Sequence, residues 1–236
     1  RVPVLVAIVV SAILLSLGIG QGVAIFAFSI CGMVVAGIFQ EWIRGTISRT
    51  RNGEMPLIAF ANLLINNRVR YGGYVIHLSI IMLSVGVIGS SFYAVQRDLV
   101  LSPGEIGEIG RYSFKYLGVD KTVFKDRVEE VAEIETYVNG KYSLNMRPFR
   151  AFYPEFRIAA TRGAIRSTPM EDFYIVPSAF EQNGQAVFRI LINPLVWWMW
   201  ASGPLLIAGF FLAMWPQRQL AASTVIMRSL KQTTRA

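Results

Sequence analysis

The sequence predicts a membrane α-helical bundle, with about four transmembrane helices, joined to a small all-β extracytoplasmic domain. Three observations lead to this fold class. The chain of 236 residues is 53% hydrophobic and only 16% charged, with a mean hydropathy of +0.45, which is typical of a membrane protein. Four apolar runs approach the roughly 20 residues that cross a bilayer as a helix. Between the third and fourth runs, extended segments alternate with turn residues, a pattern that favours strands.

The four spans and their connections divide the chain into six parts. We expect two transmembrane helices in 1–43, a basic cytoplasmic loop with a possible interfacial helix in 44–73, a transmembrane helix with a histidine in 74–95, a β domain in 96–193, a transmembrane helix in 194–215 and a basic cytoplasmic tail in 216–236. Because the sequence begins with Arg1, directly before an apolar run, we also expect it to be part of a longer polypeptide or one half of a split one.

The basic residues predict the orientation. The 44–73 loop carries five arginines and one acid, Glu54, and the 216–236 tail carries four basic residues and no acid. Both segments are therefore expected in the cytoplasm, with the β domain outside. The β domain has 13 basic and 13 acidic residues, so the net charge of +8 belongs to the membrane part. The excess is a topology signal, and it indicates no nucleic-acid partner.

Two hairpins are predicted in the β domain. The first consists of "VEEVAEIETYV" and "KYSLNMRPF" on either side of Asn139-Gly140, a dipeptide suited to a type I′ turn. The second consists of "EDFYIVPSAF" and "AVFRILI" around "EQNGQ". A segment of this length can form one small sandwich or barrel. It holds no His or Cys, and its acids are scattered among an equal number of bases, so we see no catalytic constellation in it.

His77, the only histidine, lies in a run without charged residues from Tyr74 to Tyr93. At helical spacing it shares a face with Gly73, whose missing side chain leaves room for a bulky planar group, and with Ser84. Three uses compete: a helix–helix hydrogen bond, a proton relay, and an axial bond to haem iron. A relay usually needs several ionisable groups, which these spans lack. From the residue alone, the hydrogen bond is the simplest interpretation.

The stretch "NPLVWWMW" places Trp197, Trp198 and Trp200 at the outer end of the last span. An interfacial aromatic belt explains them, and a docking surface for a flat ligand or a partner is the alternative. Three tryptophans within four residues cannot share one helix face, so at most two can serve one surface.

Arg68 and Arg70 lie just before the third span, on its cytoplasmic side, where anchoring of the membrane topology explains them. The alternative is that one of them pairs with a carboxylate of a cofactor at His77. Counted from Tyr71, His77 is about 9 Å along the helix, which is within reach of an arginine.

Three motifs, in this order and spacing, resemble the C-terminal part of the CcmF family: "NNRVRYGGYVIHLSI", "AIRSTPMEDFYIV" and "NPLVWWMWASGPLLIAGFFLAMWP". CcmF is the haem lyase component of system I cytochrome c maturation in the bacterial cytoplasmic membrane. The resemblance implies that the whole protein takes haem from a chaperone of the CcmE type and attaches it to CxxCH thiols of apocytochrome c, with a CcmH-type partner. It further implies a fixed haem b, with His77 as the iron ligand and Gly73, Arg68 and Arg70 beside it.

The chain departs from the full family in one respect. The tryptophan-rich external segment, its neighbouring histidines and the first membrane histidine of the family belong to the N-terminal part, and this sequence contains none of them. We therefore expect the N-terminal half of the same protein to be a partner, and no haem lyase activity from this part alone. Two other functions stay open: a b-haem electron-carrier subunit of a quinone-linked oxidoreductase, and a structural membrane scaffold.

Overall fold

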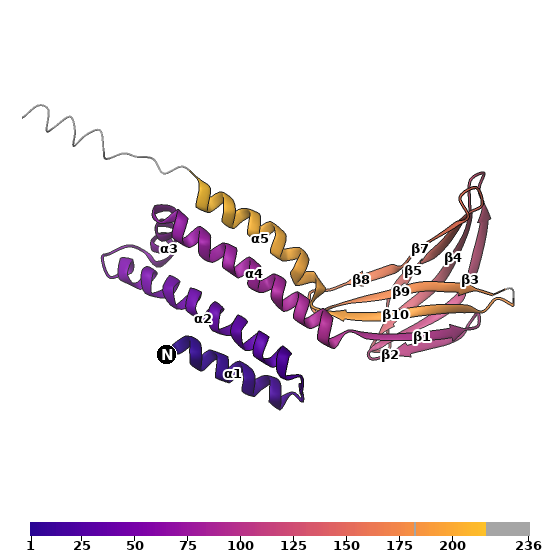
Figure 1. The fold of residues 1–236 in the computed structure, drawn as a ribbon, viewed down its shortest axis with the longest axis horizontal. Helices are drawn as coiled ribbons and strands as arrows, with labels where there is room; N and C mark the ends of the chain where they lie inside the picture. The colour runs from indigo at the N-terminus through magenta and orange to yellow at the C-terminus, as the bar shows by residue number, and fades with distance from the viewer. Residues whose placement is uncertain (182, 216–236) are drawn as a thin grey trace, which may run out of the picture. The chain divides into compact units, whose positions relative to one another are not determined.

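The computed structural model describes residues 1–181 and 183–215, so the predicted tail at 216–236 lies outside the described residues. It confirms the predicted class, apolar helices together with an all-β domain (Figure 1). The helices are α1 (Val2–Ser16), α2 (Gly22–Thr50), α3 (Pro56–Asn66), α4 (Arg68–Tyr93) and α5 (Val196–Met214). The strands between α4 and α5 are β1 (Val95–Leu101), β2 (Ile106–Ile109), β3 (Tyr112–Val123), β4 (Val128–Val138), β5 (Lys141–Met146), β6 (Phe149–Tyr153), β7 (Ile158–Arg162), β8 (Ala164–Ser167), β9 (Glu171–Phe180) and β10 (Ala186–Pro194).

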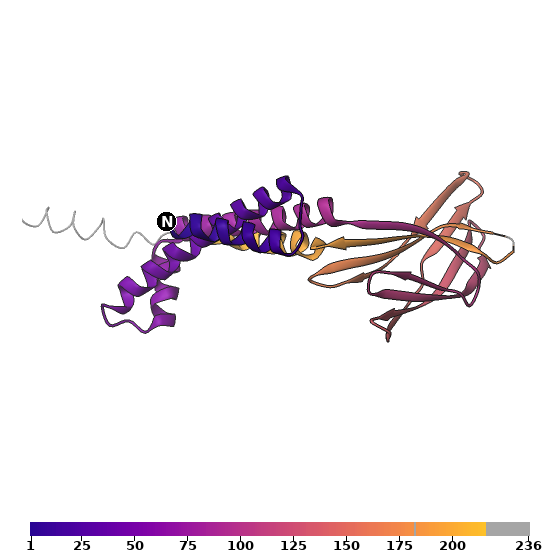
Figure 2. The ribbon, with the colours of Figure 1, turned by 90° about the horizontal axis from the view of Figure 1, so that it is seen from below.

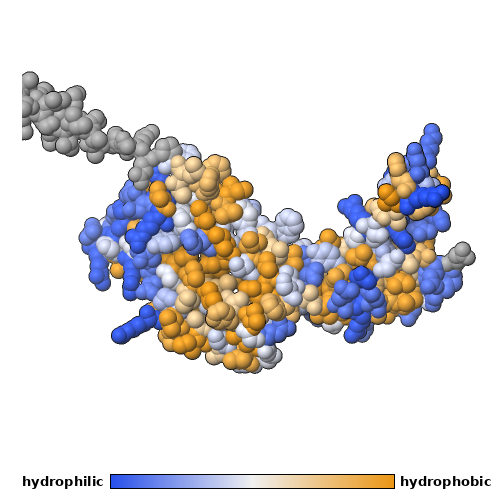
Figure 3. Space-filling view, viewed as in Figure 1, coloured by the Kyte–Doolittle hydropathy of each residue, from blue (hydrophilic) through white to orange (hydrophobic). Residues whose placement is uncertain are grey.

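Within the described residues, three helices are long and apolar enough to cross a membrane: α2, α4 and α5. The first predicted span corresponds to α1, which has 15 residues and is therefore short for a crossing. Apolar side chains cover much of the visible surface of these helices (Figure 3). Such a surface suits lipid or further membrane helices rather than water.

Two helices are longer than the spans that hydropathy predicts. α2 continues past Ile43 to Thr50, and α4 begins six residues before position 74. In α2 the hydroxyls of Thr46 and Thr50 donate to carbonyls four residues back, at 2.8 and 3.0 Å, so polar residues do not end the helix. The chain turns only at Gly53, whose φ is 94°. The predicted loop thus contains two helix ends and α3, which begins at Pro56.

The described chain forms two compact units, one of residues 1–37 with 79–203 and one of residues 38–78 with 204–215. In the first, the hydroxyls of Ser11 and Ser29 are 2.7 Å apart and join α1 to α2. In the second, Gly45 of α2 approaches Leu63 of α3 so closely that an added Cβ would lie 2.7 Å from its methyl carbon. Small and hydroxyl side chains at such contacts are typical of membrane helices.

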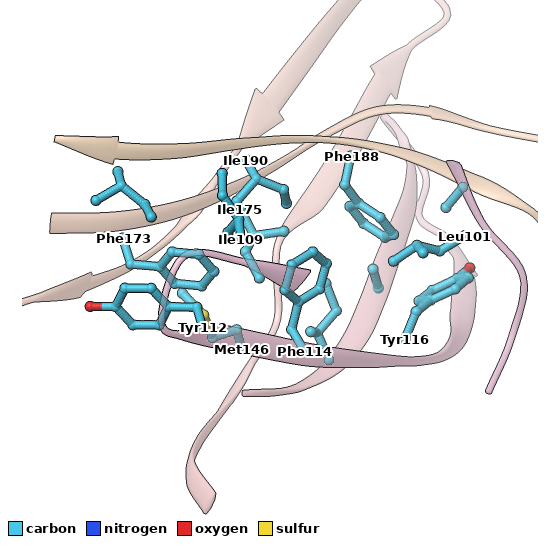
Figure 4. Packing of buried hydrophobic residues seen from close by; sticks show 14 residues of the cluster. Leu101, Ile109, Tyr112, Phe114, Tyr116, Met146, Phe173, Ile175, Phe188 and Ile190 are labelled. Carbon is cyan, nitrogen blue, oxygen red and sulfur yellow. The ribbon is translucent and has the colours of Figure 1, made fainter. Parts of the chain in front are cut away.

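The β domain is a sandwich of two antiparallel sheets (Figure 2). One has the strand order β1-β10-β9-β8, and the other has β2-β3-β4-β6-β7 with β5 also paired to β4. Their facing sides form one core, in which the ring of Tyr112 stacks on Phe173 with 4.1 Å between centroids (Figure 4). Leu101, Phe114, Tyr116, Ile134, Ile175, Phe188 and Ile190 complete most of this core.

Both predicted hairpins are confirmed. Asn139 and Gly140 have φ values of 51° and 76°, the positive pair of a type I′ turn, and the flanking residues Val138 and Lys141 are register partners. The second hairpin is β9 and β10, which pair from Glu171 to Phe180.

Candidate functional site

His77 lies on an exposed face of α4, one helical turn after Gly73. Its Nδ1 atom is 2.7 Å from the carbonyl oxygen of Gly73. Because a carbonyl oxygen only accepts, Nδ1 is the donor in this hydrogen bond, and in the neutral imidazole the single N–H proton is therefore on Nδ1. Nε2 then keeps its lone pair, which is the form in which histidine binds a metal. The helix itself therefore holds His77 in a tautomer that can act as a ligand.

Two adjacent glycines of α4 have different surroundings. A Cβ at Gly72 would lie 2.6 Å from the backbone nitrogen of Ala213, so α5 packs here at a distance that only glycine allows. On α5, a Cβ at Gly209 would likewise lie 2.9 Å from the backbone nitrogen of Ile76. A Cβ at Gly73, in contrast, would meet no described atom within 4 Å. α5 therefore covers the face of Gly72 and Ile76 and leaves the space beside Gly73 open.

Arg70 precedes His77 by seven residues, about two helical turns, and the two residues therefore share a face of α4. Its guanidinium is already engaged. Nη2 lies 2.5 Å from a carboxylate oxygen of Glu41, and Nε donates to the hydroxyl of Tyr74 at 3.2 Å. A guanidinium has five N–H donors, so Arg70 keeps donors for a further anion.

Arg68 points elsewhere. It precedes His77 by nine residues, two and a half turns, which places it on the opposite face of α4. Its Nε donates to the carbonyl of Ile65 at 2.8 Å, and it lines a hollow with Phe211 of α5 and with Trp215, which follows α5. Of the two predicted arginines, the geometry therefore brings only Arg70 to the face of His77.

The three tryptophans of α5 divide into two groups. Trp198 donates its indole N–H to the carbonyl of Pro169 at 2.9 Å and so fastens α5 to the β8–β9 connection. Trp197 and Trp200 are 41% and 77% exposed and, three residues apart, lie on one side of the helix. Only this pair can serve a docking surface.

Leu195 connects β10 to α5 and packs against the outer end of α4. This residue has a φ of 61°, unusual for a side chain with a Cβ, and its N–H donates to the carbonyl of Met170 at 2.9 Å. An added Cβ at Gly89 would lie 2.8 Å from the Leu195 side chain, and one at Gly86 would lie 3.0 Å from its carbonyl oxygen. Gly86 and Gly89 of α4, which have no side chain, thus leave room for the bend at Leu195 that connects β10 to α5.

Sequence reasoning missed several of these residues. Glu41 was not among the predicted site residues, although it pairs with Arg70 across two helices. A role for Gly72, Gly209 or Leu195 was also not predicted from the sequence. For Gly72, the detectable signal was a small residue in an apolar helix, because small residues permit close approach of a second helix.

A family model, curated relatives and a solved structure all show similarity of this chain to CcmF-type proteins. A family model described as the CcmF C-terminal beta-sandwich matches residues 92–194. The cytochrome c-type biogenesis protein CcmF of Pseudomonas aeruginosa is 28% identical over 181 residues, which is 77% of this chain and 27% of that protein. CcmF of Haemophilus influenzae is 26% identical over 152 residues, which is 64% of this chain and 24% of that protein.

A solved structure, the cytochrome c heme lyase CcmF, superposes with a TM-score of 0.67 at 23% identity, covering 90% of this chain and 34% of that one. It shows a shared fold. The chain spans about a quarter of the length of the curated relatives it matches.

Proposed function

We propose a function for this chain from the premise that it corresponds to the C-terminal part of CcmF-type proteins, whose β-sandwich and membrane helices it carries. It is a multi-pass inner-membrane protein with an extracytoplasmic β domain. As part of a cytochrome c haem lyase, it supplies one axial ligand, His77, to a fixed haem b. The remainder of the protein provides the second ligand and the surface that holds substrate haem.

The observation that carries this proposal is the hydrogen bond from Nδ1 of His77 to the carbonyl of Gly73. It orients the ring and leaves the lone pair on Nε2, as a hydrogen bond from the other ring nitrogen does in metal-binding histidines. Within residues 1–181 and 183–215, no cluster of three or more His, Cys, Asp or Glu could hold a metal ion. A haem site needs no such cluster, because the porphyrin itself supplies the equatorial ligands and this chain has to contribute only one histidine.

The residues around His77 fit a planar group. The open space beside Gly73 would accommodate a ring edge, and Arg70 offers free N–H donors on the same face to a propionate. Glu41 holds the Arg70 side chain in place and partly neutralises it. Haem would supply one-electron redox chemistry when bound, while His77 would hold it and Arg70 would orient it.

The partners follow from the same premise. The names of the relatives place them in cytochrome c biogenesis. We therefore propose a haem chaperone of the CcmE type, apocytochrome c and a CcmH-type protein as partners. The exposed pair Trp197 and Trp200 offers a flat apolar surface at the outer end of α5 for one of them or for haem in transit.

Replacement of His77 by alanine in the complete protein tests the ligand assignment. We expect loss or loosening of the b-haem, read from the reduced optical spectrum, together with a lower yield of cytochrome c. Added imidazole should partly restore the spectrum. The matched control is Ser84→Ala on the same helix, which removes a similar side-chain bond to the carbonyl four residues back, at 2.9 Å, without touching a haem ligand. A His77→Ala protein with the parental spectrum and yield would reduce His77 to a structural residue.

A further inference from the structure

The two sheets of the β domain diverge at the end farthest from α4 and α5 (Figures 1 and 2). There the inner face of the six-stranded sheet is left partly uncovered. It forms a groove of about 300 Å³, which we call the distal groove, lined by Lys121, Val128, Glu130, Arg150, Phe152 and Ala159. Glu130 has the same strand parity as the buried residues Ala132 and Ile134, so the groove continues the core-facing side of the sheet.

Strand register arranges the groove in two rows. Lys121, Glu130, Arg150 and Thr161 are register partners across β3, β4, β6 and β7 and form a charged row. The next row, two residues along each strand, is apolar and consists of Val123, Val128, Phe152 and Ala159. Val123 and Phe152 are 74% and 46% exposed, which is high for apolar side chains on the inner face of a sandwich.

The charged row has an excess of positive charge. Nζ of Lys121 lies 3.2 Å from a carboxylate oxygen of Glu130, and Nη1 of Arg150 donates to the carbonyl of Ser178 at 3.1 Å. One carboxylate thus stands between two cations. A carboxylate from a bound partner would therefore balance the remaining positive charge of the row.

The edge beside the groove is unpaired. β7 pairs with β6 on one side, and within the described residues no strand pairs with its other side. All five of its residues are exposed. The alternative edge, residues 176–180 of β9, is blunted by Pro177, which lacks an N–H. β7 therefore offers its backbone groups to an added strand.

We propose that the distal groove binds an extended segment of a partner protein, which adds as an antiparallel strand to β7. All pairings in the domain are antiparallel. A residue opposite Thr161 would place its side chain in the charged row, and the residue two positions later, opposite Ala159, would enter the apolar row. The segment thus carries an acidic residue followed two positions later by an apolar one. Arg150 lies about 10 Å from the added strand, at about 4.8 Å per strand, a distance that arginine and glutamate side chains span together.

Selection of random eight-residue displayed peptides on the complete protein in nanodiscs tests this proposal, which does not rest on haem binding. Enriched peptides should carry the acidic-then-apolar pattern. Their affinity, measured by fluorescence anisotropy, should fall at least tenfold on Arg150→Gln and severalfold on Lys121→Gln. The matched control is Lys115→Gln on the outer face of β3, which should leave affinity unchanged. All three variants should keep the parental haem spectrum.

Backbone pairing makes a second demand on the same peptides. N-methylation of one alternate set of peptide nitrogens should abolish binding, and methylation of the other set should be tolerated, because only one set faces β7. Selection that yields no binder, peptides without the pattern, or equal affinity for the parental, Arg150→Gln and Lys121→Gln proteins would overturn the proposal. Equal effects of the two methylated sets would overturn the edge pairing.

Discussion

Alanine at Gly72 and alanine at Gly73 should have opposite consequences, although the residues are adjacent. A Cβ at Gly72 would lie 2.6 Å from the backbone nitrogen and 2.8 Å from the Cα of Ala213. Ordinary contact begins at 3.4 Å, so α5 would have to move by about 0.8 Å, the difference between 3.4 and 2.6 Å. Backbone atoms cannot rotate away as a side chain can. Overpacking of this kind costs about 1–3 kcal/mol.

At Gly73 an added methyl group meets no described atom within 4 Å, so the packing of α4 against α5 should not change. Alanine also favours a helix over glycine by up to about 1 kcal/mol. The haem, however, is proposed to use that space beside His77. Gly73→Ala should therefore keep the helices packed and lower the haem content.

Two assays separate these effects. Thermal unfolding of protein purified from haem-starved cells should show a lower midpoint for Gly72→Ala by several degrees, and an unchanged or higher midpoint for Gly73→Ala. Haem content after normal growth should fall for Gly73→Ala. A Gly72→Ala protein with the parental midpoint would refute the close approach of α5, and full haem content in Gly73→Ala would refute the use of the open space.

Two further predictions concern the β domain. Gly140→Ala, at a φ of 76°, should destabilise the hairpin by about 1 kcal/mol and speed hydrogen exchange in residues 134–146 roughly fivefold, whereas unchanged exchange would contradict the type I′ geometry. Hydrogen bonds from Arg189, at 3.0 and 3.1 Å, hold the pKa of Asp98 below its usual value, so their stabilisation is present at neutral pH and is lost as pH falls below about 4. Acid unfolding of the Asp98→Asn protein should then be less steep, and an identical pH profile would contradict the role of the pair.

Local rules predicted the parts of this fold that depend on neighbouring residues. Asn139-Gly140 specifies a turn type through its own backbone preference, and the apolar runs specify spans through length. The C-terminal end of α2 was missed because hydropathy detects lipid-facing residues, whereas a helix continues through polar ones such as Thr46 and Thr50 until a residue like Gly53 turns the chain.

The candidate site was predictable in its central residue and not in its surroundings. His77 stands out because an imidazole in a charge-free span needs a reason. Arg68 and Arg70 looked equivalent in the sequence, yet helical phase separates them and Glu41, distant in the chain, engages one of them. Trp198 could not be told from Trp197, because its partner, the Pro169 carbonyl, comes from another part of the fold.

The central claim is that Nε2 of His77 binds haem iron, and replacement of His77 by methionine tests it most directly. His77→Met in the complete protein offers a thioether in place of an imidazole, and methionine–histidine ligation raises the reduction potential of haem. A redox titration followed optically should therefore show a b-haem whose midpoint potential has shifted upward, or a protein that has lost this haem. A b-haem present in full amount with the parental spectrum and midpoint potential would contradict the assignment of His77 as its ligand.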